Sequence, residues 1–384
     1  MSVRKRTWTT RKGGTKEAWV VDYADQRGQR HIKTFERKKE ADAYAASVRV
    51  DIRAGMQTSS KATVAHAGKH WIDSCKAYGL EASTLESYQQ HLDDHIVPYL
   101  GTVKLSQLTV PVIRNFMDRL RADGRSPAMV KRVVSDLGSI LADAQERGEV
   151  AQNVVRSLSK RRKRREAERR QKGKLKVGID IPTPAEIKAI VAQLQGRWRP
   201  LLLTAIFAGL RASEIRGLRW QDVDLKRGEL HVRQRADKFK TIGKPKSAAG
   251  ERTVPMPPIL VNTLREWKLA CPKSELGLVF PTGAGEVEYH SNIVTRGLAP
   301  VQVAAGVVTK GGAPKYTGLH ALRHFYASWC INRKEDGGLG LPLKVVQHRL
   351  GHSSIQMTAD VYGHLFPSGD DGAELAAAEK TLLG

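Results

Sequence analysis

Three short groups of polar residues stand near the end of the chain: Gly318-Leu319-His320-Ala321-Leu322-Arg323-His324, Leu350-Gly351-His352 and Tyr362-Gly363-His364. The apolar residues around them recur at helical spacing, which predicts helices here; they are Val345, Val346, Leu350, Ile355 and Val361. A guanidinium that stays charged, imidazoles that titrate and a phenol together suit a site that holds a phosphate group. How this segment folds decides whether these side chains meet.

The segment belongs to a mixed α/β domain that we place at residues 180–384. Thr183-Pro184-Ala185-Glu186 has the pattern of a capping box with proline at the first helical position, which predicts a helix start. A second arginine, Arg211, lies just before Glu214 in the segment Gly209-Leu210-Arg211-Ala212-Ser213-Glu214. We expect helices over 201–218 and from 259 onward, and strands at 229–233 and 252–256.

Before this domain, residues 61–155 are predicted to form a bundle of four helices. Helix starts are indicated at Thr109 and Ser126, and by a capping-box pattern from Ser83 to Glu86.

Residues 1–60 are predicted to form a small sheet with one helix. Two β-prone runs, 19–23 and 31–35, flank a turn at 25–28, and one helical face follows over 41–52. The predicted fold class is therefore mainly α with small β-sheets, in several domains.

The chain has a formal net charge of +25, and basic residues recur in every segment. This favours a nucleic-acid partner. A membrane is disfavoured, because no apolar run approaches the roughly 18 residues that span a bilayer. Residues 156–179 are predicted to be a basic linker: 156–176 contains twelve lysines or arginines against two glutamates, which is +10 of the total charge. Such a segment is too charged to fold alone, and it can also follow a phosphate backbone.

The candidate DNA-binding residues are Arg4, Lys5, Arg6, Lys131, Arg132, Arg161, Arg162, Arg164 and Arg165. The basic N-terminus has no apolar run after it, and the three cysteines are scattered. We therefore expect no secretory signal, disulfide framework or structural zinc site, and a location in the reducing cytoplasm of a host cell, at its nucleoid.

Cleavage of a phosphodiester needs cations around the nonbridging oxygens, a nucleophile and an acid for the leaving oxygen. Arg211 and Arg323 suit the first role, because a guanidinium can bind two oxygens at once. His320 and His352 can donate to the same oxygens, and His324 is a weaker candidate for this. Tyr362 can be the nucleophile, and Lys246 can protonate the leaving oxygen. A phosphotyrosine stores the energy of the broken bond, so no cofactor and no metal are expected.

These residues, taken in order, resemble the tyrosine recombinase (phage integrase) family: Arg211 with Glu214, Lys246, His320-x-x-Arg323-His324, Leu350-Gly351-His352 and Tyr362-Gly363-His364. The resemblance is close over about residues 180–366. The bundle is similar to the family's core-site-binding domain, and residues 1–60 are similar to the arm-site-binding domain of lambda-type integrases. One segment departs from the family pattern, which has Pro-Lys-Thr, then Ser and Arg before Val-Pro. Here Pro245-Lys246-Ser247 is followed by Ala248-Ala249-Gly250-Glu251, so Lys244 and Lys240 remain alternatives to Lys246.

The resemblance implies a catalytic set of Arg211, Lys246, His320, Arg323, His352 and Tyr362, with Glu214 and His324 in support. It implies a 3′-phosphotyrosyl intermediate, four protomers on two double-stranded attachment sites, and as further partners a host DNA-bending protein and an excision factor. The N-terminal module favours an integrase of a phage or other mobile element. Two alternatives stay open: a type IB topoisomerase, which shares this chemistry, and a catalytically silent DNA-binding regulator.

Overall fold

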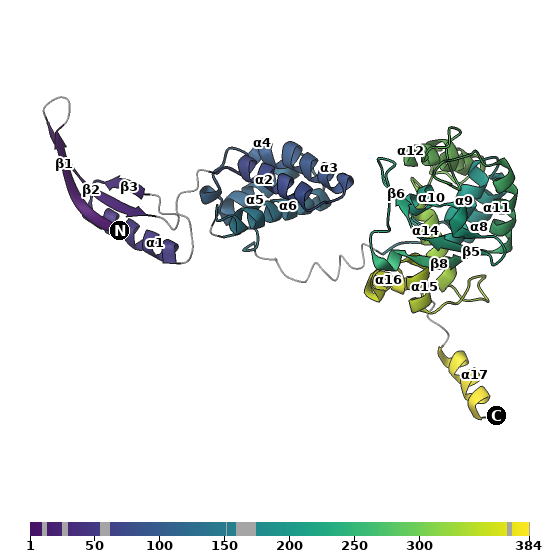
Figure 1. Ribbon diagram of the computed structural model, residues 1–384. Coiled ribbons are helices and arrows are strands. Elements are labelled where there is room, and N and C mark those ends of the chain that lie inside the picture. Colours follow the sequence, from purple (N-terminus) through teal and green to yellow (C-terminus); the bar gives the residue numbers. More distant parts are fainter. Residues whose placement is uncertain are drawn as a thin grey trace. The chain divides into compact units, whose positions relative to one another are not determined.

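The computed structural model describes residues 1–9, 14–24, 30–53, 62–150, 152–158, 174–366 and 371–383. The chain divides into two compact units, Met1–Arg161 and Arg162–Gly384, which are described separately (Figure 1). Helices predominate and the sheets are small and antiparallel, which confirms the predicted fold class. Within these ranges, no helix is both long enough and apolar enough to cross a membrane.

The first unit begins with a three-stranded antiparallel sheet and one helix: β1 (Ser2–Thr9), β2 (Thr15–Ala24), β3 (Arg30–Phe35) and α1 (Lys38–Arg53). Ala41, Ala45 and Val48 recur on one face of α1 and are buried in a small core with Val21 and Tyr23 of β2. The prediction of β2, β3 and the helix is confirmed. The sequence of β1 lacks the alternation of apolar and polar residues that predicts a strand. Among its side chains, only that of Val3 is partly buried. The predicted turn at 25–28 lies outside the described residues.

The helical bundle follows in the same unit. Its elements are α2 (Val64–Ala77), α3 (Ala82–His91), the π-helical turn η1 (Leu92–Ile96), α4 (Val97–Leu100), the short 3₁₀ helix η2 (Leu105–Gln107), α5 (Val110–Ala122) and α6 (Pro127–Glu146). The side chains of Thr109 and Ser126 cap α5 and α6 by accepting backbone hydrogen bonds, as predicted. The predicted capping box at Ser83 is wrong. α3 begins earlier, because the carbonyl of Glu81 already accepts hydrogen bonds from Thr84 and Leu85.

The second unit is built around α9 (Trp198–Ala208), whose apolar residues are buried almost all round. Around it lie α8 (Pro184–Gln193), α11 (Pro258–Ala270), α12 (His290–Asn292), the π-helical turn η5 (Ile293–Leu298), α13 (Ala299–Ala304) and α14 (Leu319–Ile331). The capping box at Thr183 and Glu186 is confirmed, with both reciprocal hydrogen bonds present.

A small sheet completes the second unit. The predicted strands are confirmed as β5 (Glu229–Val232) and β8 (Arg252–Pro255), which pair antiparallel, and β4 (Val223–Asp224) is a third strand. The segment between β5 and β8 forms the short hairpin β6 (Arg235–Ala236) and β7 (Ile242–Gly243) and the 3₁₀ turn η4 (Ala248–Gly250). The remaining elements are α10 (Ala212–Gly217), η3 (Trp220–Asp222), α15 (Leu343–Leu350), α16 (Ile355–Tyr362), η6 (Gly363–Leu365) and α17 (Asp371–Leu383).

Candidate active site

Arg211 is presented by a sharp turn at the end of α9. Gly209 has a φ of 59° there, and a Cβ atom on it would lie 2.2 Å from the Tyr326 ring, so only glycine fits. The chain then enters α10 with Arg211 at the N-cap. The Arg211 guanidinium donates to Glu214 Oε1 at 2.8 Å and to the Gly351 carbonyl at 2.9 Å. Its side chain is 37 % exposed, so this braced cation still faces solvent.

Arg323 comes from α14 and is almost completely buried. Its guanidinium donates to the Gly209 carbonyl at 2.7 Å and also to the Leu350 carbonyl. Burial, together with the nearby charge of Arg211, lowers the pKa of Arg323 to about 9, so the group is still charged at neutral pH. Arg211 and Arg323 thus bond to consecutive carbonyls, although they lie far apart in the sequence.

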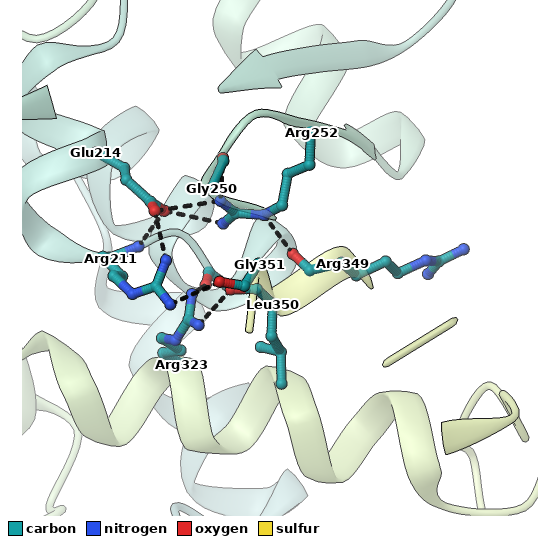
Figure 2. A network of polar contacts seen from close by, with 9 residues as sticks. Arg211, Glu214, Gly250, Arg252, Arg323, Arg349, Leu350 and Gly351 are labelled. Atoms are coloured by element: carbon teal, nitrogen blue, oxygen red, sulfur yellow. Dashed lines mark hydrogen bonds and ion pairs between the residues drawn. The ribbon is translucent and has the colours of Figure 1, made fainter. Parts of the chain in front are cut away.

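The sequence did not predict the buried ion pair between Arg252 and Glu214, which lies next to Arg211. Arg252, on β8, donates to Glu214 Oε1 at 3.1 Å and to Oε2 at 2.8 Å, and its side chain is 0 % exposed (Figure 2). It also donates to the carbonyls of Arg349 and Gly250. Burial alone would raise the pKa of Glu214, but Arg252, Arg211 and Arg323 lower it to about 2. A signal was present: Arg252 stands just before Val254-Pro255, where the family pattern has an arginine.

His352 follows the turn at Gly351, which has a φ of 64°. The His352 Nδ1 atom lies 2.9 Å from the hydroxyl of Thr358, and its ring stacks on that of Tyr362 with centroids 6.2 Å apart. Burial lowers the pKa of His352 to about 4, and Arg323 and Arg211 act in the same direction. The imidazole is therefore neutral at pH 7.

Tyr362 ends α16 and is 1 % exposed. Its hydroxyl lies 2.7 Å from Nδ1 of His324, and burial raises the pKa of Tyr362 to about 12 although Arg323 and Arg211 oppose this. Burial lowers the pKa of His324 to about 4, with His320 and Arg323 as further causes. The His320 ring packs edge-on against His324, with centroids 4.5 Å apart, and His320 is otherwise exposed. Partial burial of its ring and the two arginines lower the pKa of His320.

Lys246 is exposed in the segment between β7 and η4. This segment contacts the ion pair of Arg252 and Glu214 through Gly250. Pro245 packs on Gly250, and the Gly250 carbonyl accepts a hydrogen bond from Arg252. Of the two alternatives, Lys240 has its ammonium 4.2 Å from the centroid of the Tyr289 ring, and Lys244 is exposed.

The candidate DNA-binding residues that the structure describes are all on the first unit. Arg4, Lys5 and Arg6 are exposed on β1, where Arg4 bonds to Asp22 at 3.4 Å and Lys5 to Glu17 at 2.6 Å. Lys131 and Arg132 are exposed on α6. Arg161, Arg162, Arg164 and Arg165 lie outside the described residues.

The lowered pKa values of His324 and His352 predict that the second unit loses stability as the pH falls below neutral. His324 and His352 titrate near pH 4 in the folded chain, against about 6.5 when unfolded. As the pH falls, these histidines therefore take up protons in the unfolded chain before they do so in the folded one. The contribution of the neutral histidines to the free energy of unfolding is complete above about pH 6.5 and declines toward pH 4. Glu214 adds a further loss from about pH 4.5 down to about 2.

Thermal unfolding at pH 7.5 and pH 5 would measure this effect. We expect a lower unfolding temperature of the second unit at pH 5, and a smaller decrease for His352→Asn, whose amide can keep the bond to Thr358. An unfolding temperature that is equal at both pH values would contradict the prediction.

The chain is similar to known proteins over most of its length. The family described as "Phage integrase family" matches residues 182–368, and the one described as "Phage integrase, N-terminal SAM-like domain" matches residues 64–121. A "Tyrosine recombinase XerC-like" protein of Caldanaerobacter subterraneus subsp. tengcongensis is 28 % identical over 372 residues, which cover 89 % of this chain and 90 % of the relative. The "ICEBs1 integrase" of Bacillus subtilis is 24 % identical over 288 residues and covers 72 % of each chain.

Two solved structures share the fold. The Tn1549 transposon integrase in complex with transposon right end DNA has a TM-score of 0.64 at 17 % identity, covering 84 % of this chain and 100 % of that chain. A lambda integrase tetramer bound to a Holliday junction has a TM-score of 0.56 at 16 % identity, covering 91 % of this chain and 95 % of that one.

Proposed function

The chain belongs to the phage integrase family, and from this we propose that it cuts and rejoins double-stranded DNA at specific sites through a 3′-phosphotyrosyl intermediate on Tyr362. The family match confirms the predicted recombinase class. One observation carries the assignment of residues: Arg211 and Arg323 converge on the carbonyls of Gly351 and Leu350, directly before His352, whose ring stacks on Tyr362.

In the proposed reaction, Arg211 and Arg323 bind the nonbridging oxygens of the scissile phosphate. His352 and His320 donate hydrogen bonds to the same oxygens; His352 is fixed through Nδ1 by Thr358, which leaves Nε2 for the phosphate. Glu214 and Arg252 are positioning residues, because they hold Arg211 and the turn at Gly351 without facing the phosphate.

In the first step, one bond to phosphorus forms while another breaks. The phenolic oxygen of Tyr362 forms a bond to phosphorus while the bond from phosphorus to the 5′-oxygen breaks. The phenolic proton passes to His324, the neutral acceptor beside it, and Lys246 gives a proton to the leaving 5′-oxygen. The 5′-hydroxyl of a partner duplex then attacks phosphorus and releases Tyr362, which completes strand exchange.

Replacing Lys246 with alanine should slow cleavage by about 10²–10⁴-fold, because a 5′-alkoxide leaves poorly without a proton. Lys240→Ala and Lys244→Ala are matched controls in the same segment and should stay within about threefold of the wild type. Single-turnover formation of the covalent complex would measure these rates.

The role of Lys246 can be separated from a structural one by changing the leaving group. In a duplex with sulfur in place of the 5′-bridging oxygen, the leaving thiolate needs no proton, so Lys246→Ala should then cleave nearly as fast as the wild type. An equal defect on both duplexes would show that Lys246 is not the acid, and a defect in Lys240→Ala instead would move the role to that residue.

The remaining parts of the chain would hold the DNA. We propose that residues 1–60 bind arm-type sites, that 61–155 binds the core site, and that the basic linker 156–179 follows the phosphate backbone. Arg4, Lys5, Arg6, Lys131, Arg132 and the linker arginines 161, 162, 164 and 165 would supply the cations. Four protomers on two sites, a host DNA-bending protein and an excision factor complete the assembly of a mobile-element integrase, which acts in the cytoplasm at the nucleoid.

Recombination between two plasmids tests the function. Core sites would first be selected by binding from a pool of randomised duplexes, then placed on both plasmids or on one. Joined plasmids that require both sites would support the recombinase. Relaxation of a supercoiled plasmid without joining would instead indicate a type IB topoisomerase, and DNA binding without either product would indicate a silent regulator.

A further inference from the structure

Two histidines and one glutamate form a cluster in the helical bundle that the proposed reaction does not use. His66 and His70 lie one turn apart on α2, so both project from the same face of the helix. Their Nε2 atoms are 3.1 Å apart. Glu149 follows the end of α6, and one ligand atom from each of the three residues lies within 4.8 Å of the others.

The packing of α2 against α6 brings these residues together from distant parts of the sequence. Ser74 donates to Asp143 at 2.9 Å, and Arg147 bonds to both of them at 2.6 and 2.7 Å. The chain then turns back, with the backbone N–H of Glu149 bonded to the Ala144 carbonyl at 2.8 Å. The position of Glu149 is therefore determined by the fold.

Glu149 has an unusual environment. Its Oε2 atom is buried and has no hydrogen-bond partner among the described residues. A buried carboxylate oxygen without a partner costs free energy. A hydrogen bond between the two imidazoles would account for His66 and His70, but it would leave this oxygen unsatisfied, whereas a cation between the three groups would satisfy all of them.

We propose that His66, His70 and Glu149 bind one divalent transition-metal ion, for which Zn²⁺ is best suited. Imidazole nitrogen and carboxylate oxygen bind Zn²⁺ at about 2.0–2.2 Å, so ligand atoms of a tetrahedral site lie about 3.3–3.5 Å apart. The two histidine nitrogens already have nearly this spacing, and rotation of the flexible Glu149 side chain brings in the third ligand. Mg²⁺ and Ca²⁺ are disfavoured because they prefer oxygen ligands throughout.

The ion would join the first turns of α2 to the segment that leaves α6. It would thereby hold the end of α6 against α2, just before the chain continues toward the basic linker. No metal was expected from the scattered cysteines or from the proposed chemistry. Glu149 is far from the histidine pair in sequence, and only the packing of α2 on α6 brings it near.

Zinc binding to the full chain tests the proposal. The protein would carry no histidine tag, would be freed of metal with a chelator, and would be titrated with ZnCl₂ in a calorimeter. We expect one ion per chain, with affinity reduced at least about tenfold by His66→Ala, by His70→Ala and by the isosteric Glu149→Gln. His348→Ala is the matched control, since His348 is exposed on α15 outside the cluster, and it should bind as the wild type does.

Two further readouts make the result decisive. Co²⁺ in place of Zn²⁺ should give the intense visible absorption of a tetrahedral site, and saturating Zn²⁺ should raise the unfolding temperature of the bundle by about 5 °C or more. Absence of stoichiometric binding would overturn the proposal, as would binding that His70→Ala leaves unchanged. Unchanged affinity in Glu149→Gln would overturn the three-ligand site. None of these outcomes depends on recombination.

Discussion

Tyr362→Phe should abolish covalent attachment to DNA, with a loss of at least about 10⁴-fold, while the protein stays folded and still binds its site. The substitution removes a single oxygen atom, which the proposed reaction requires as the nucleophile. The same change breaks the hydrogen bond to His324, which costs only about 1 kcal/mol of stability. The fall in covalent attachment would therefore be far larger than the small loss of folding stability could cause.

A nicked duplex carrying the selected core site traps the covalent complex, because the short strand released on cleavage diffuses away. The wild type should give a slow band on a denaturing gel, and Tyr362→Phe should give none. Tyr326→Phe is the matched control, because Tyr326 is equally buried in the same unit but its ring lies against Gly209 and not beside His324. A covalent band with Tyr362→Phe would show that another residue is the nucleophile.

Glu214→Gln should destabilise the second unit by about 3–5 kcal/mol, because it leaves the charge of Arg252 buried without a counter-ion. The side chains of Arg252 and Glu214 are 0 % and 2 % exposed, so water cannot replace the lost partner. Asp222→Asn is the matched control, since Asp222 is as buried but its partners Arg219 and Arg233 are 27 % and 60 % exposed. It should cost only about 1 kcal/mol.

Chemical denaturation of each variant measures these free energies of unfolding. The double variant Glu214→Gln/Arg252→Met sharpens the test, because it removes the buried charge together with its partner. It should recover most of the lost free energy of unfolding. It should not recover the cleavage activity, because Arg211 would still lack its ion pair with the carboxylate of Glu214. A cost below about 1 kcal/mol for Glu214→Gln alone would contradict the account of the ion pair.

The proximity of residues in short ordered motifs could be predicted from the sequence. Arg323 and His324 occupy adjacent positions of α14, and His352 precedes α16, which ends at Tyr362. The predicted helices and the order of the motifs are therefore enough to expect these residues in one place. The strands β5 and β8 were likewise predictable from their local composition.

Features that depend on pairing across the chain were not predictable in this way. β1 is a strand only because β2 lies beside it, since nearly all its side chains are exposed. The bond between Arg252 and Glu214 joins β8 to α10. The family pattern contains an arginine at the position of Arg252, but it does not predict the partner of that arginine. The start of α3 was misplaced because Ser83 and Glu86 match a capping box by type, whereas the backbone had already turned helical at Ala82.

The hydroxyl of Tyr362 is enclosed in the protein, because the side chain is 1 % exposed, so a phosphorus atom of a duplex cannot reach it in this conformation. In the proposed reaction, Tyr362 can attack only after the groups that cover its hydroxyl have moved, so a protomer that collides with DNA at random would be latent. On this proposal, the nucleophile would be released only where binding to DNA supplies the free energy of that movement. The folded protein would then leave intact any DNA that it contacts only briefly.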